Sequence, residues 1–127
     1  YPYFAFPSGE GIPADYYTPL LEHTNKPLAV AEGGWTSRPV GPVQGDEPGQ
    51  VAYLQAIHDQ LGDRLSFWVY LILTDFNMDS FAEIMRQEGR AESDIEGLGM
   101  FASVGLLEFD GAAKPALALW DSYRGEE

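Results

Sequence analysis

Two short, almost wholly apolar runs stand out along the chain. The first is Leu28–Glu32, in which the only polar residue is the last one, and the second is Leu65–Leu73, interrupted only by Ser66. Antiparallel strands usually alternate apolar and polar positions, whereas strands of a parallel sheet that is covered on both faces are apolar throughout. The pattern therefore predicts two buried parallel strands, with Glu32 at the C-terminal end of the first.

A segment with the hydrophobic spacing of a helix lies between these two runs. Leu54, Ile57 and Leu61 recur at i, i+3 and i+7, which places them on one face of a helix. Asp46 is a good capping residue at the start of this helix, and Gly62 is a typical residue at its end. Shorter helices are expected at Ala14–His23, Ser80–Gln87 and Ala112–Tyr123, a third strand at Tyr1–Phe6, and a strand or an extended segment at Gly105–Phe109.

The alternation of strands and helices predicts an α/β fold with a small parallel sheet. The chain has 127 residues, of which 45% are hydrophobic, and this suits one domain over residues 1–127 with a core of its own. A closed (β/α)8 barrel needs roughly 200 residues or more, so the chain is too short for one. A sheet of three strands has edges to cover, and we expect the remainder of a larger sheet or a second copy to cover them.

Composition narrows the class of partner. Seven Lys and Arg residues stand against 20 Asp and Glu residues, which gives a net charge of −13. Nucleic acids and anionic membrane surfaces bind clustered basic residues, so neither is an expected partner. The chain has no cysteine, and its two histidines, His23 and His58, lack a second ligand at metal spacing. We therefore expect no metal site.

Glu32 is the first candidate for chemistry. A buried carboxylate without a partner costs several kcal/mol, so stability alone does not favour an acidic residue at the end of an apolar strand. Reactive groups of α/β folds lie at the C-terminal ends of parallel strands, and Gly33-Gly34 allows backbone or ligand to approach closely. The alternative is a strand-end residue that pairs with a lysine or faces water. Asp75, just past the second strand, is a weaker second carboxylate.

Aromatic residues near the strand ends are candidates for binding. Trp35 follows the double glycine and suits stacking on a sugar face, or else it covers the end of the sheet. Trp68 and Tyr70 share parity, so they point to one face, which is either a pocket wall or the core. Tyr3, or Tyr1, is placed to donate a hydrogen bond that keeps a carboxylate ionised.

Several motifs together resemble a known family. Lys26-Pro27, the apolar strand and then Glu32, two glycines and Trp35 resemble the seventh strand of clan A glycoside hydrolases. The remaining motifs follow in the order of that family, in its endo-β-1,4-galactanase-like branch. They are Tyr1-Pro2-Tyr3-Phe4 with Ile12-Pro13 and Tyr16-Tyr17 for the sixth strand and helix, Phe67-Trp68 to Asp75 for the eighth strand, and Gly105-Leu106-Leu107, Asp110-Gly111, Lys114-Pro115-Ala116 and Trp120 for the closing segment.

The resemblance implies a retaining glycosidase that cleaves β-glycosidic bonds in polysaccharide or oligosaccharide, on a (β/α)8 barrel of which this chain is the C-terminal part, approximately strands six to eight. Glu32 would match the nucleophile, and Tyr3, or Tyr1, would match the aromatic residue of the sixth strand that contacts it. Trp35, with Trp68 or Tyr70, would border the sugar subsite. No cofactor is implied. The family's acid/base lies on the fourth strand, so we expect this segment by itself to be inactive.

Two other interpretations remain open at the level of sequence. One is a sugar-binding module or pseudo-enzyme that uses Trp35, Trp68 and Tyr70 as stacking platforms. The other is an acidic α/β domain that assembles through its sheet edges. The sequence specifies neither the sugar and linkage nor a location in the cell, although members of the resembled family are often exported.

Overall fold

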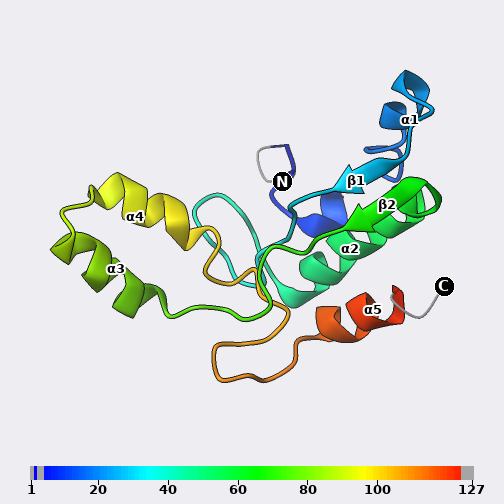
Figure 1. Cartoon of the computed structure of the whole chain (residues 1–127). Coiled ribbons are helices and arrows are strands. Elements are labelled where there is room, and N and C mark those ends of the chain that lie inside the picture. The colour runs from blue at the N-terminus through cyan, green and yellow to red at the C-terminus, as the bar shows by residue number, and fades with distance from the viewer. Residues whose placement is uncertain (1, 3–4, 124–127) are drawn as a thin grey trace.

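The structure is a computed structural model that describes residue 2 and residues 5–123. Two strands, β1 (Leu28–Val30) and β2 (Leu65–Trp68), lie side by side and parallel, as Figure 1 shows. They are connected by the long helix α2 (Glu47–Leu61) and the single turn η3 (Gly62–Arg64). The chain is thus mixed α/β with a parallel pair of strands, as the two apolar runs predict.

The pairing of the two strands extends beyond their formal ends. Val30 lies opposite Trp68 in the register of the sheet. Past this point the N–H of Val69 donates to the carbonyl of Val30, and the N–H of Leu71 donates to the carbonyl of Gly33, each at 2.8 Å. The second strand therefore continues alongside the residues that follow β1, up to the neighbourhood of Glu32.

Helix α2 has the boundaries that the sequence predicts. The Asp46 side chain accepts a hydrogen bond from the Gly49 N–H at 2.7 Å, which satisfies one of the free donors of the first turn. Gly62 is the residue at its C-terminal end. Leu54, Ile57 and Leu61 are all buried, which confirms the apolar face.

Helix α5 (Pro115–Tyr123) packs beside α2 and completes the cover of the sheet. The Trp120 ring lies 4.9 Å from that of Trp68 and 5.6 Å from that of Tyr70, measured between centroids. Trp68 and Tyr70 therefore pack against the helix layer. The buried residues of this core are Trp35, Val43, Tyr53, Leu54, Ile57, Leu106 and Ala116.

Helices cover only one face of the sheet among the described residues. On the other face Phe67, Val69 and Leu73 are 56%, 45% and 61% exposed. The prediction that both strands are buried on both faces is thus wrong for this chain, because α2 and α5 pack on the same side. The open face is apolar, as an interior face would be.

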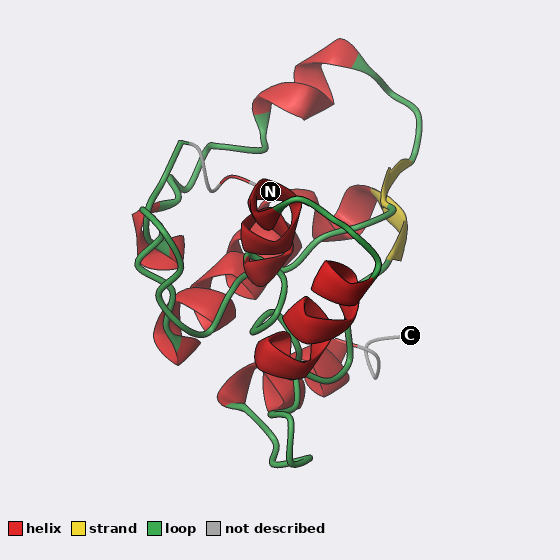
Figure 2. Cartoon of the chain, turned by 90° about the vertical axis from the view of Figure 1, so that its left-hand side faces the viewer, coloured by secondary structure: helices red, strands yellow, loops and turns green. Residues whose placement is uncertain are grey.

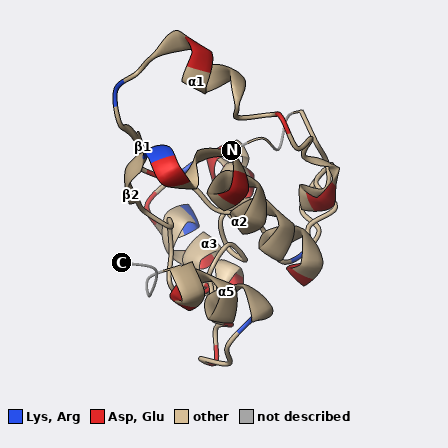
Figure 3. Ribbon diagram, turned by 90° about the vertical axis from the view of Figure 1, so that its right-hand side faces the viewer, with Lys and Arg blue, Asp and Glu red and all other residues tan. Residues whose placement is uncertain are grey.

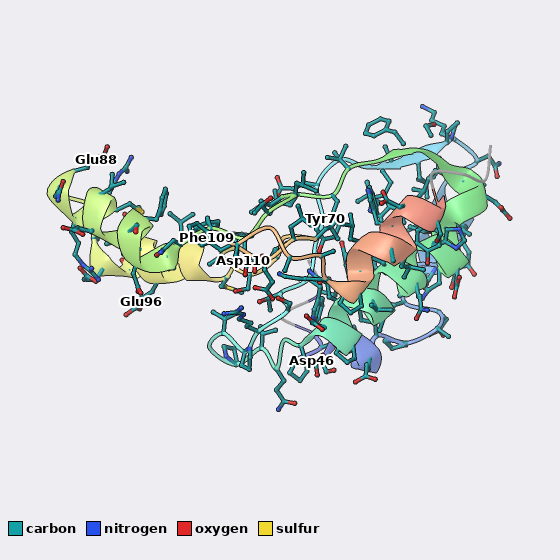
Figure 4. All side chains as sticks on the ribbon, turned by 90° about the horizontal axis from the view of Figure 1, so that it is seen from below. Asp46, Tyr70, Glu88, Glu96, Phe109 and Asp110 are labelled. Carbon is teal, nitrogen blue, oxygen red and sulfur yellow. The ribbon has the colours of Figure 1, made fainter. Side chains whose placement is uncertain are left out.

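Residues 78–99 form a helical arm that the sequence predicts in part. Helix α3 (Met78–Gln87) is capped by the Asn77 side chain, which accepts from the Ser80 N–H at 3.0 Å. Helix α4 (Glu92–Gly99) packs against it, and the two project away from the sheet in Figures 1 and 4. The helix predicted at Ser80–Gln87 corresponds to α3, whereas the sequence pattern predicts no helix where α4 lies.

Three expected elements differ from the structure. In the predicted strand Tyr1–Phe6, the N–H groups of Ala5 and Phe6 both donate to the Pro2 carbonyl, which is a turn; residues 1, 3 and 4 lie outside the described residues. The helix expected at Ala14–His23 is shortened to α1 (Pro19–His23), because Pro19 lacks an N–H and starts a helix instead of continuing one.

Gly105–Phe109, expected as a strand or an extended segment, forms single bridges and no regular strand. Leu107 pairs in parallel with Thr74 and in antiparallel with Ala113. The short turn η2 (Gly9–Gly11) packs against the start of α2, where the backbones of Gly9 and Gly49 approach too closely for a side chain. Figure 2 shows how little of the chain is strand and how much is helix and loop.

Acidic residues are spread over the elements, and the ribbon in Figure 3 shows few basic residues among them. Within the described ranges, 2 and 5–123, no helix has the length and apolar character that crossing a bilayer requires.

Candidate functional site

Glu32 lies two residues beyond β1, at the C-terminal end of the parallel strands, and its side chain is exposed. It lines an open groove with a volume of about 390 Å³. The other lining residues come from the extension of β2, the arm and the segments that join them: Leu71, Ile72, Phe76, Phe81, Leu98 and Phe101. The groove is therefore apolar, with one carboxylate at its border among the described residues.

The double glycine after Glu32 is required by packing inside the protein. A Cβ on Gly33 would collide with the Tyr53 hydroxyl, and a Cβ on Gly34 would collide with the Val104 side chain. The groups that approach these glycines most closely are side chains of the protein, whereas the sequence analysis expected backbone or ligand.

Trp35 is fully buried and faces away from solvent. Its ring stacks on that of Tyr53, with centroids 5.8 Å apart and planes inclined by 30°. It thus anchors the loop that follows Glu32 to helix α2. In this position the ring presents no exposed surface on which a sugar stacks.

Trp68 and Tyr70 both contact Trp120 of α5. Of the two expected positions, pocket wall or core, the structure therefore shows the core position. The Tyr70 hydroxyl also donates to the Val104 carbonyl at 2.7 Å. Tyr3 lies outside the described residues. The groove beside Glu32 is lined by Phe76, Phe81 and Phe101. The predicted aromatic residues Trp35, Trp68 and Tyr70 do not line it.

Gln50 is a residue that the sequence reasoning missed. Its side chain is fully buried, and its Nε2 lies within hydrogen-bond distance of the carbonyls of Trp35, Val104 and Gly105, at 3.1, 2.9 and 3.0 Å, and of the Tyr70 hydroxyl at 3.0 Å. A single amide thus joins the loop after Glu32 to the segment before α5. Its spacing four residues before Leu54, on the apolar face of α2, is the signal that points to a buried position.

Asp75 forms a buried ion pair that the sequence does not reveal. The Lys114 ammonium donates to both carboxylate oxygens at 2.7 Å and to the Ser37 hydroxyl at 2.9 Å. Burial raises the pKa of Asp75, and the hydrogen bond and charge of Lys114 partly oppose this rise. Ser37 in turn donates to the Ser103 carbonyl at 3.0 Å. Asp75 therefore fixes the loops around the site and has no position in the groove.

Glu108 is a further acidic residue, and it is engaged in an ion pair. The Glu108 carboxylate accepts a hydrogen bond from Arg38 at 2.7 Å. Among the described residues no group of three or more His, Cys, Asp or Glu side chains is placed to hold a metal ion. The chemistry of the candidate site therefore centres on Glu32.

Comparison of the chain with models of protein families, with curated proteins and with solved structures found no match.

Proposed function

We propose that this chain is the C-terminal part of a retaining glycoside hydrolase and that Glu32 is its nucleophile. The observation that carries the proposal is the place of Glu32, at the C-terminal end of a parallel strand and at the border of an open groove. Active sites of (β/α)8 barrels lie at this end of the strands. The sequence resemblance to clan A enzymes assigns the same residue.

The architecture supports a barrel in which β1 and β2 are neighbouring strands. They are parallel, α2 connects them, and α2 and α5 cover one face. The opposite face exposes Phe67, Val69 and Leu73, which are the kind of residues that fill a barrel interior. In this proposal the rest of the barrel covers that face and both free edges of the pair.

The proposed chemistry needs two carboxyl groups. The Glu32 carboxylate attacks the anomeric carbon and forms a glycosyl ester while the bond to the leaving oxygen breaks, and a second carboxyl group donates the proton to that oxygen. The same group then removes a proton from the water that cleaves the ester. Asp75 and Glu108 are engaged by Lys114 and Arg38, so we assign the acid/base to another part of the barrel.

Covalent trapping tests Glu32 without needing the acid/base. The protein is produced from its complete gene and treated with dinitrophenyl deoxyfluoro-β-glycosides of glucose, galactose, mannose and xylose. Dinitrophenolate leaves without protonation, and the fluorine slows the release of the glycosyl ester. We expect peptide mass spectrometry to find one sugar attached at Glu32.

Glu32→Gln is the matched control, because it removes the nucleophile and keeps the size of the side chain. We expect it to prevent labelling and turnover while sugar binding survives. Failure of all four reagents to label the protein, or a label on another residue, would contradict the proposal.

A further inference from the structure

The groove beside Glu32 has two walls of different origin. One wall is formed by Leu71, Ile72 and Phe76, which follow β2 along the chain. The other comes from the arm and its end: Phe81 of α3, Leu98 of α4 and Phe101. The groove has a volume of about 390 Å³, which lies within the range of small-molecule sites, roughly 300–1,000 Å³.

Phe81 links the two walls and keeps part of its surface accessible. Its ring contacts that of Phe76, with centroids 5.5 Å apart and planes inclined by 61°. The side chain is nevertheless 39% exposed. The arm has its own small core of Ala82, Met85 and Ile95, which α3 and α4 close between them. Phe81 is not one of these residues, so its ring is available to the groove.

The lining favours an apolar group over a second sugar. Each sugar hydroxyl that leaves water needs a hydrogen-bond partner, and Glu32 is the one lining side chain among the described residues that offers strong acceptors. An aryl group has no hydroxyl hydrogen bonds with water to give up, and it gains contact with three phenylalanine rings. The net charge of −13, together with Glu32 itself, disfavours an acidic substituent.

We propose that this groove binds the aryl aglycone of a neutral β-glycoside, with the anomeric carbon next to Glu32. The proposal rests on the function proposed above and narrows its substrate class from glycans to aryl glycosides. The groove is continuous with the candidate nucleophile, so an aglycone bound there remains attached to the carbon that Glu32 attacks.

Calorimetric binding to the protein made from its complete gene tests this proposal. The probes are phenyl and methyl β-glycosides of glucose, galactose, mannose and xylose, the β-linked disaccharides of the same sugars, and phenol alone. We expect the phenyl glycoside of the preferred sugar to bind about tenfold more tightly than its methyl and disaccharide counterparts. Phe81→Ser should remove most of this preference.

Ile84→Ser is the matched control, because Ile84 lies on the same helix, is 54% exposed and does not line the groove. It should leave the preference unchanged. A preference for disaccharides, a phenyl preference that Phe81→Ser leaves intact, or no binding of any probe would overturn the proposal.

The outcomes separate this inference from the function on which it rests. Labelling of Glu32 without a phenyl preference would keep the nucleophile and reject the aryl site. Binding of phenol that depends on Phe81, without labelling of Glu32, would show an apolar site and reject both the glycosidase and the aglycone assignment.

Discussion

Among the described residues, the body of the chain, formed by β1, β2, α2, α5 and the segments around them, buries seven hydrophobic residues in one core, whereas the arm of α3 and α4 buries three. Buried polar groups add to the body: Gln50 joins separate loops, and Lys114 pairs with Asp75. In the arm the main polar contact is the exposed pair Arg86–Glu92, at 2.7 Å.

The two sides of the groove are therefore held by different kinds of contact. Buried contacts between distant segments hold the side that carries Glu32, so its geometry depends on cooperative folding of the whole body. The arm, which carries Phe81, depends on a few apolar contacts between adjacent helices, and exposed ion pairs add little. Changes in the arm should therefore alter the groove without unfolding the body.

The largest expected effect comes from breaking the buried pair in the body. Lys114→Met leaves the Asp75 carboxylate in place without its cation, and loss of one partner of a buried pair costs about 3–5 kcal/mol. The measurement is the midpoint of urea unfolding by circular dichroism. The double variant Asp75→Leu with Lys114→Met should be more stable than the single one. If Lys114→Met were as stable as the wild type, the ion pair would not contribute to the stability of the body.

A pair of glycine substitutions compares the packing of the two regions. Gly34→Ala puts a methyl group against the buried side chain of Val104 and should destabilise the protein by about 2–3 kcal/mol. Gly97→Ala lies in α4 with open space around it and should stabilise the arm by up to about 1 kcal/mol, because alanine favours helix. Thermal unfolding of both variants measures whether stability falls for Gly34→Ala and rises for Gly97→Ala. Effects of the same sign would contradict the comparison.

Loss of a buried side chain in the arm should have a local effect. Met85→Ala shortens a residue that is 8% exposed between α3 and α4. We expect the free energy of unfolding of the arm to fall by about 1–2 kcal/mol. This loss is below the ~2–5 kcal/mol typical of a fully packed core, because the arm buries few residues. Hydrogen exchange should accelerate in α3 and α4 and stay unchanged in α2. Equal acceleration in α2 would show that arm and body unfold together.

The last expected effect is a loss of stability in alkali. Burial, with a smaller contribution from neighbouring Tyr16, raises the pKa of Tyr17 from 10.0 to about 12. The folded state thus retains this proton more strongly than the unfolded state does. The corresponding stability is present below pH 10 and is lost as the pH rises towards 12. Tyr17→Phe should flatten that part of the curve of urea midpoint against pH, and an unchanged curve would exclude Tyr17 as its source.

Local patterns were sufficient for part of the fold. Asp46, Gly62 and the spacing of Leu54 with Ile57 specify α2, because caps and helical periodicity depend on residues close in sequence. The two apolar runs specify a parallel pair of strands, and the position of Glu32 follows from the end of the first run. The family resemblance and the roles it assigns remain predictions.

The sequence pattern was thus enough to predict α2, the parallel pair and the strand-end position of Glu32. The folded structure was needed to show that Trp35 and Tyr70 face the core, that Lys114 pairs with Asp75, and that the arm supplies a wall of the groove. These two groups of features differ in the distance along the chain between the residues involved. A helix cap joins residues three apart, whereas contacts between segments many residues apart depend on how all the elements pack together.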